Sequence, residues 1–176
     1  IGDESRVTRN KIILGVIDQK AKTTIKSLDD IKEALNVTLG QAFKQTSCIV
    51  TNDDGLQWLD TLKNDRGEYL LQPSPAAPMK MVLCAGATTV PVKVIPNDDM
   101  PSDTTTKGTT KIPVIIGDLK EGIKFFDRKR MTLITSNIAV AGELNAFEED
   151  LTLFRAIERE DCKTKDDAAF VNGVLT

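Results

Sequence analysis

Histidine is absent from all 176 residues of the chain. Imidazole is the commonest general base and a common zinc ligand, so its absence excludes Ser-His and Cys-His triads and most zinc sites. The only cysteines are Cys48, Cys84 and Cys162, an odd number without CxxC or zinc spacing, which favours a reducing compartment such as the cytoplasm. These absences lower the expectation of catalysis, although an enzyme can work with Asp, Glu, Lys or Tyr alone. We predict a protein that is not an enzyme, with no catalytic residues, no cofactor and no metal.

Long apolar runs and an excess of basic charge are lacking too. The longest apolar stretches, near Ile112–Ile116 and Leu151–Phe154, are strand-sized, so we expect no membrane partner. The net charge is −3 and the pI about 5.1, which leaves only local, non-specific contact with nucleic acid. Hydrophobic residues make up 40% and charged residues 28%, which is typical of one globular domain or two small interleaved ones.

Two helices are predicted from periodicity and capping. Ser27 is a good N-cap with Asp30 placed to complete a capping box, and apolar residues then recur at spacings of three and four: Leu28, Ile31, Leu35, Leu39 and Phe43. Asn52 or Asp53 should cap a second helix that carries Leu56, Trp58, Leu59 and Leu62, and we expect at least Leu59 to be buried.

The remaining apolar segments are strand-like, so the sequence predicts an α+β fold. We expect strands or extended segments at Ile12–Ile17, Cys48–Thr51, Tyr69–Leu71, Met79–Leu83, Val90–Ile95, Ile112–Ile116, Ile123–Phe126, Met131–Thr135 and Leu151–Glu160, and a final apolar element at Ala168–Leu175. Pro91 suggests an edge strand or a strand start.

Turn and loop signals separate these elements. Asn64–Gly67 should be a turn in which Gly67 can take a positive φ. Pro73–Pro78 should be an irregular loop with three prolines, and Asn97–Thr110 a mobile surface loop. We place further charged turns at Asp127–Arg130 and Asp161–Asp167. The acidic pairs, including Asp98-Asp99, fit no calcium-loop pattern.

Four segments in order resemble one known family. The first, Cys48 to Leu71, is similar to a family passage in which a strand ends in Asn, a helix follows, and "Leu-Lys-Asp-x-x-Gly-Arg-Tyr-Leu" leads to a loop, with Glu68 here in place of the usual Arg. The second, Ile115 to Asn137, resembles its "Gly-Asp-Phe … Asp-Arg" strand pair, with Asp127-Arg128 at the Asp-Arg position. The closing Arg155 to Leu175 and the opening Ile1 to Ile17 resemble its last strand and the passage after its long spine helix. The family is the major capsid protein of tailed bacteriophages, of the Hong Kong ninety-seven phage type.

This resemblance implies a fold with an axial domain, whose central sheet is flanked by helices, and part of a peripheral domain. The axial domain would run from Ser27 to Asp127, with the tail Asp161–Thr176 returning to it. The peripheral remainder would be Ile1–Lys26 and Arg128–Glu160. The chain would then be a C-terminal fragment without the family's N-terminal arm, extended loop and most of its spine helix.

The implied function is that of a structural subunit that self-assembles into pentamers and hexamers of an icosahedral shell around double-stranded DNA. The chief partners would be other copies of the protein, then a scaffold protein, a maturation protease and a portal, with packaged DNA contacted only non-specifically. The protein would be located in the virion capsid, and in the bacterial host cytoplasm during assembly.

Possible intersubunit contacts are Arg128, Lys129 and Arg130, as a basic run, and Asp98 and Asp99, in the long loop. A solvated turn is the alternative for the basic run, because most charge runs are simply hydrated. Two rival functions remain: an encapsulin-type compartment that uses the same fold to hold enzymes, and a small cytoplasmic hydrolase, which would need a well-formed pocket with convergent carboxylates.

Overall fold

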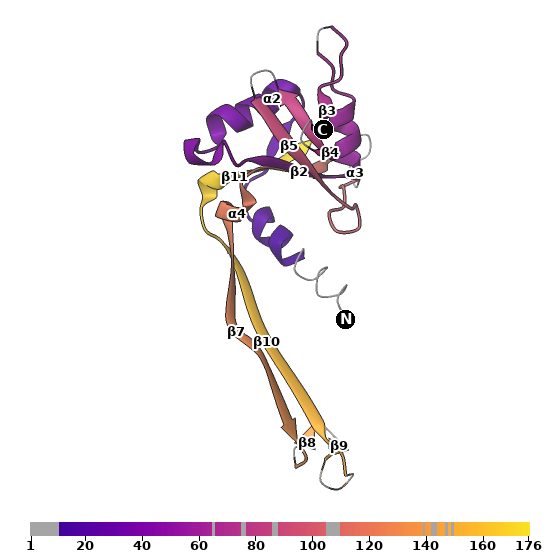
Figure 1. Ribbon diagram of the computed structural model, residues 1–176, viewed down its shortest axis with the longest axis vertical. Coiled ribbons are helices and arrows are strands. Elements are labelled where there is room, and N and C mark those ends of the chain that lie inside the picture. The colour runs from indigo at the N-terminus through magenta and orange to yellow at the C-terminus, as the bar shows by residue number, and fades with distance from the viewer. Residues whose placement is uncertain are drawn as a thin grey trace. The chain divides into compact units, whose positions relative to one another are not determined.

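The computed structural model describes residues 11–64, 66–74, 77–85, 88–104, 110–138, 140–141, 144–146, 148 and 150–176; the side chains of 77–79, 85, 127–131, 140–141, 144–145 and 158–160 fall outside that description. The chain separates into two compact units (Figure 1). The sheet unit comprises Ile1–Lys124 and Thr164–Thr176, and the ribbon unit comprises Phe125–Lys163.

Seven strands form the mixed sheet of the sheet unit, in the order β1-β11-β6-β2-β5-β4-β3. Their bounds are β1 Thr23–Ile25, β2 Cys48–Asn52, β3 Leu71–Ser74, β4 Ala77–Ala85, β5 Thr88–Ile95, β6 Ile112–Gly117 and β11 Phe170–Leu175. β11 runs parallel to β1 and antiparallel to β6, while β2 runs antiparallel to β6 and parallel to β5. The last strand of the sequence thus lies well inside the sheet.

Helices flank this sheet, which confirms the α+β prediction. The helix that starts after Ser27 is α2 (Leu28–Glu33), and Ser27 and Asp30 form the expected capping box. α2 continues as a π-helical turn, η1 (Ala34–Thr38), and a 3-10 turn, η2 (Gln41–Phe43), follows. α3 (Asp53–Asp60) is capped by Asn52, and α4 (Leu119–Gly122) and the 3-10 turn η3 (Asp167–Ala169) are short. Of the predicted apolar face, Ile31, Leu35 and Leu39 are buried.

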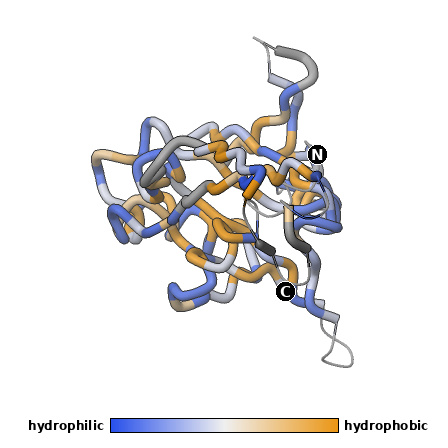
Figure 2. Tube along the Cα trace, turned by 90° about the horizontal axis from the view of Figure 1, so that it is seen from below, coloured by the Kyte–Doolittle hydropathy of each residue, from blue (hydrophilic) through white to orange (hydrophobic). Residues whose placement is uncertain are grey.

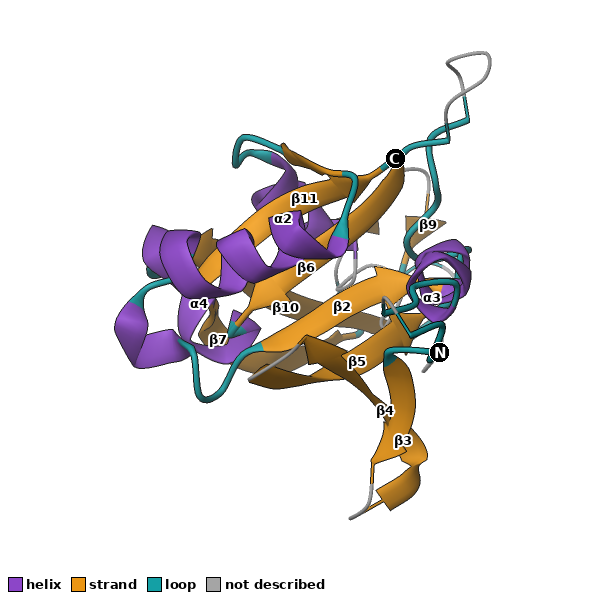
Figure 3. Cartoon of the chain, turned by 90° about the horizontal axis from the view of Figure 1, so that it is seen from above, coloured by secondary structure: helices purple, strands orange, loops and turns teal. Residues whose placement is uncertain are grey.

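The core lies on the face of the sheet that α2 and α3 cover. One row of paired residues crosses four neighbouring strands, namely Val171, Ile116, Ile49 and Val92, and all four are buried. Ile31, Leu35 and Leu59 from the helices belong to the same cluster. Figure 3 shows α2 lying over β11 and β6, and Figure 2 shows the hydrophobic stretches of the chain in orange.

The ribbon unit consists mainly of two long paired strands, β7 (Ile123–Ser136) and β10 (Leu153–Thr164). The first two residues of β7 and the last residue of β10 belong to the sheet unit. A two-residue pair, β8 (Val140–Ala141) with β9 (Leu144–Asn145), lies between them in sequence. Among the described residues no helix has the length and apolarity needed to cross a membrane.

Four local predictions were wrong, wholly or in part. Residues 11–18 are helical and not a strand, and Ile17 is buried while Ile13 and Leu14 are half-buried, at helical spacing. Asp127–Arg130 is not a turn, because β7 continues through it, and β10 likewise continues into the predicted Asp161–Asp167 turn. Most of Pro73–Pro78 belongs to the β3–β4 hairpin; Pro73 is tolerated because β3 pairs on one side only.

Pro91 lies inside the sheet and not at its edge. It pairs with Val82 of β4, but the pairing of β5 with β2 begins one residue later, at Val92. The missing N–H of Pro91 therefore falls just before the second ladder starts.

The two outermost described strands of the seven-stranded sheet are short. β1 has three residues and is flanked by Lys22 and Lys26. β3 has four residues, contains Pro73, and shifts its register to β4 between Pro73 and Ser74. Short strands, lysines, prolines and bulges all disfavour the pairing of an edge with another chain.

Candidate contact surfaces

A hydrogen-bonded cluster at the start of α3 holds the segment that follows β5. The buried Asn52 side chain accepts a hydrogen bond from the Gly55 N–H (2.9 Å), which caps α3, and its Nδ2 donates to the Met100 carbonyl (2.9 Å) and Ser102 Oγ (2.8 Å). Ser102 Oγ in turn donates to Asp54 (2.6 Å). The first part of the predicted mobile loop is therefore tied to the sheet unit; residues 105–109 lie outside the described residues.

Asp98 and Asp99, two of the predicted contact residues, lie on this tied segment. The Asp98 side chain is exposed, whereas Asp99 is half-buried. Asn97 beside them accepts a hydrogen bond from the Asp53 N–H (3.1 Å), and the Asp53 carboxylate accepts one from the Asn97 N–H (3.4 Å). Asp98 is thus presented to solvent on a segment whose backbone is held on both sides.

The other predicted contact residues, Arg128, Lys129 and Arg130, lie in the ribbon unit. Their backbone belongs to β7, and their side chains fall outside the described part of the chain. The two predicted groups therefore belong to different units of the chain.

Exposed apolar side chains are concentrated on the ribbon. Leu133 (63% exposed) and Ile134 (49%) are adjacent in β7, so they point to opposite faces. Phe154 on β10 is 68% exposed, and Phe125 and Ile138 are exposed too. A two-stranded sheet is only marginally stable by itself in water, and apolar groups on both of its faces mark a surface that needs covering. The ribbon is the candidate contact surface with the largest apolar content.

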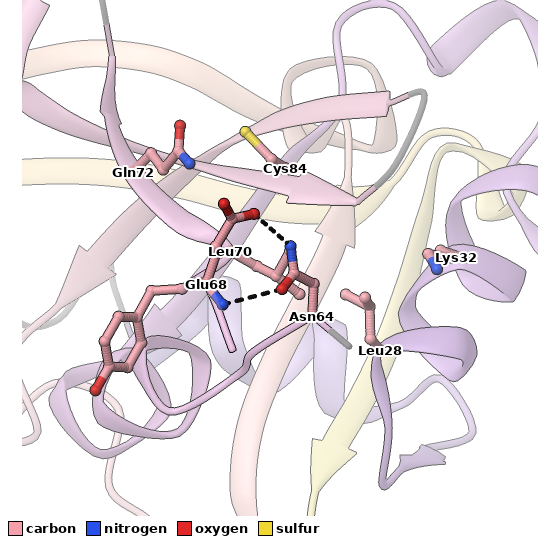
Figure 4. A pocket seen from close by; sticks show the side chains of 8 residues that line it. Leu28, Lys32, Asn64, Glu68, Leu70, Gln72 and Cys84 are labelled. Carbon is pink, nitrogen blue, oxygen red and sulfur yellow. Dashed lines mark hydrogen bonds between the residues drawn. The ribbon is translucent and has the colours of Figure 1, made fainter. Parts of the chain in front are cut away.

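A hollow of about 350 Å³ lies beside α2 and the Asn64–Gly67 turn (Figure 4). It is lined by Leu28, Lys32, Asn64, Glu68, Tyr69, Leu70, Gln72 and Cys84. Glu68 supplies its one carboxylate, which accepts a hydrogen bond from Asn64 Nδ2 (2.8 Å). A hydrolase built on paired carboxylates would need a second such group, so this lining gives the hydrolase alternative no support.

The titrating groups with shifted pKa values have structural partners. The Thr46 hydroxyl, the largest influence, and the N–H groups of Glu121 and Lys120 hold the pKa of Asp118 below its ordinary value, against the effect of burial; Asp118 caps α4. Burial raises the pKa of the Cys48 and Cys162 thiols, which disfavours the reactive thiolate. No described set of three or more His, Cys, Asp or Glu side chains is placed to hold a metal ion.

Sequence reasoning missed two features of these surfaces. An Asn directly after a buried strand signalled the cap of α3, but its bonds to Met100 and Ser102 cross about fifty residues of sequence. The two-faced ribbon did leave a signal: Leu133 and Ile134 are neighbours, so no single face of a strand could bury both.

Comparison with known proteins now adds to this geometry. The model of the phage capsid family matches residues 11–175. Two solved structures of similar fold are the capsid of an empty GTA particle (18% identity, TM-score 0.50, 84% of this chain) and the capsid of a native GTA particle (18%, 0.51, 84%). The chain spans 44% and 43% of the length of those capsid chains. No curated protein sequence matches. A family match over nearly the whole chain, on a fold shared with capsid subunits, establishes that this chain belongs to the phage capsid family.

Proposed function

We propose that this chain is part of a major capsid protein and works as a structural, non-catalytic building block of an icosahedral shell. The observation that carries the proposal is the family match over residues 11–175. The capsid-like fold and the exposed apolar ribbon support it, because a shell subunit needs surfaces that remain uncovered until neighbours arrive.

We propose that the sheet unit contains the axial domain and that the ribbon unit is part of the peripheral domain; the proposed peripheral segment Ile1–Lys26 belongs to the sheet unit. In the family's terms the axial part is Ser27–Asp127 with Asp161–Thr176, and the peripheral part is Ile1–Lys26 and Arg128–Glu160. The chain crosses between its two units at Lys124–Phe125 and Lys163–Thr164, within three residues of those proposed boundaries.

Other copies of the same protein are the partners that this role requires. The ribbon offers them apolar area through Leu133, Ile134 and Phe154, and the tied segment offers the exposed Asp98. Pentamers and hexamers use heterologous contacts, in which one patch meets a different patch of the next copy, so two separate surfaces on one subunit suit a ring. A scaffold protein, a protease, a portal and non-specific contact with packaged DNA complete the proposed set.

The test is electron microscopy of the full-length natural protein expressed in bacteria, combined with analysis of what the particles contain. Closed icosahedral particles that protect double-stranded DNA from nuclease are the expected result when the other virion components are present. Particles filled with a cargo enzyme would assign the encapsulin role in place of the viral one. A protein that forms no particles under any of these conditions would refute the shell function.

A further inference from the structure

The ring of Phe170 lies where three distant parts of the chain meet inside the sheet unit. Phe170 is the first residue of β11 and is 1% exposed. The Nζ of Lys20, two residues beyond helix 11–18, lies 4.6 Å from its ring centroid. A β-carbon on Gly122, the last residue of α4, would lie 2.6 Å from its Cδ1. We call Lys20, Gly122, Lys165 and Phe170 the Phe170 junction.

Lys20 fastens the end of helix 11–18 to this junction. Its ammonium group donates hydrogen bonds to the backbone carbonyls of Asp167, in η3, and Phe170. Such bonds from a charged donor are stronger than those between neutral groups, and the ring face adds a cation–π attraction. Lys20 is also a cation just past a helix C-terminus, where the helix dipole favours positive charge.

Asn172, two residues further along β11 and on the same face of the strand as Phe170, holds the same helix end. Its buried Nδ2 donates to the carbonyls of Ile17 (3.1 Å) and Lys20 (3.2 Å). The Ile17 carbonyl also accepts the Lys20 N–H (3.0 Å), so the last turn of the helix is closed both locally and by an amide 152 to 155 residues away in sequence. The helix end is therefore positioned by β11.

The two segments that lead into β7 and out of β10 are bonded to each other at the same place. The Lys165 N–H donates to the Gly122 carbonyl (2.8 Å), and the Lys165 side chain pairs with Glu121. The Asp118 N–H donates to the Ala169 carbonyl (2.8 Å). Lys20, through its bond to Asp167, connects helix 11–18 to this paired backbone.

We propose that the Phe170 junction is a conformational joint, in which Lys20 locks helix 11–18 to η3 and the start of β11 and whose opening frees the helix while the sheet stays folded. The opening should stay local because Lys20 is only half-buried, and the central cluster that includes Ile49 of β2 and Ile116 of β6 contains neither Lys20 nor Phe170. The role of this joint rests on the proposed shell function: in an assembling subunit, helix 11–18 could change direction there while the sheet of the axial domain stays folded.

The test is hydrogen–deuterium exchange of the full chain, followed by mass spectrometry, for the wild type, Lys20→Met, Lys20→Arg and the control Lys22→Met. Met keeps the length of the side chain but removes its donors and charge, and Lys22 is a nearby lysine that pairs with Asp18 on the surface. Loss of a charged hydrogen-bond donor should speed exchange in peptides covering 11–20 and 164–170 by about tenfold or more.

The expected pattern is faster exchange at those peptides in Lys20→Met, partial recovery in Lys20→Arg, and wild-type rates in Lys22→Met. Peptides of β2 and β6 should exchange at wild-type rates in all four proteins. Unchanged exchange at 11–20 in Lys20→Met would overturn the joint, and so would an increase spread evenly over the sheet. The exchange experiment measures this chain alone and does not depend on shell formation. A failure of the full-length protein to form shells would therefore refute the shell function without refuting the joint.

Discussion

Gly55 of α3 lies directly against the side chain of Thr51 in β2: a β-carbon added to Gly55 would stand 1.8 Å from Thr51 Oγ1 and 2.9 Å from its Cβ. Thr51 is fully buried, and its hydroxyl donates to the Pro113 carbonyl (3.0 Å), so it has no room to retreat. The glycine therefore sets how closely this helix approaches the sheet.

Gly55→Ala should lower the free energy of unfolding, although alanine is the better helix former by about 1 kcal/mol. The overlap with Thr51 should outweigh that gain, for a net loss of about 1–3 kcal/mol, as for overpacked cores. Gly15→Ala is the matched control, because no atom lies within 4 Å of the added carbon there. In urea unfolding, Gly15→Ala should leave the free energy of unfolding unchanged or raise it. The same result for Gly55→Ala would show that α3 can move away from Thr51.

Leu59→Ala should cost about 2–5 kcal/mol, the usual range for a core leucine. Leu59 is fully buried on α3 and belongs to the central cluster, as we predicted from the sequence. Val37→Ala, at a side chain that is 75% exposed, should change stability by less than about 0.5 kcal/mol. Equal urea midpoints for the two variants would contradict this packing.

Asn52→Ala should loosen the segment that carries Asp98. The change removes the α3 cap and both bonds to Met100 and Ser102, leaving the buried Met100 carbonyl without that donor. We expect a loss of about 1–3 kcal/mol and faster amide exchange at residues 97–104. Asn36→Ala, at an exposed asparagine, is the control and should leave exchange there unaltered.

Asp118 should make the fold sensitive to acid. Its pKa is lowered in the folded state, chiefly by the Thr46 hydroxyl, so its contribution to stability is present above the unfolded-state pKa of about 3.9 and is lost as pH falls through the lower folded value. Stability should therefore fall less steeply below about pH 4 in Asp118→Asn than in the wild type. In Thr46→Val, an NMR titration should find the pKa of Asp118 raised. An unchanged pKa would show that the Thr46 hydroxyl is not what lowers it.

Leu133→Asp in the full-length protein should prevent or weaken particle formation. A charge on the exposed ribbon would have to be buried by any partner that covers it, which is costly without an opposite charge. Val37→Asp places the same charge on an exposed apolar site of the sheet unit and should interfere less. Normal particles from Leu133→Asp, seen by electron microscopy, would exclude this part of the ribbon as a contact.

The sequence predicted well those elements whose signals are local. The capping box at Ser27, the Asn52 cap, the positive φ of Gly67 and the burial of Leu59 all follow from residues within a few positions of each other. The prediction of a strand at Ile12–Ile17 was wrong because a short apolar run suits either a strand or a buried helix. The contact of this segment with β11 favours the helix, and that contact cannot be read from the local sequence.

Charge misled the prediction at Asp127–Arg130. Four charged residues in a row are typical of a turn, but a strand of a two-stranded ribbon has no interior face that would exclude them. The candidate contact surfaces were predictable only in part, because they depend on contacts between residues that are far apart in the sequence. Asp98 could be placed on a loop, whereas the bonds that hold that loop, and the junction around Phe170, join residues that only the fold brings together.

The blunted edges of the seven-stranded sheet bear on how errors of assembly are corrected. Subunits in a growing particle are crowded, and an open strand edge at that concentration would invite main-chain pairing, the route to fibrils that do not dissolve. In the proposed shell, β1 with three residues between lysines and β3 interrupted at Pro73 would favour contacts between misplaced copies through side chains and loops over main-chain pairing. Such contacts are individually weak and reversible, so a wrongly placed subunit can leave before its neighbours trap it.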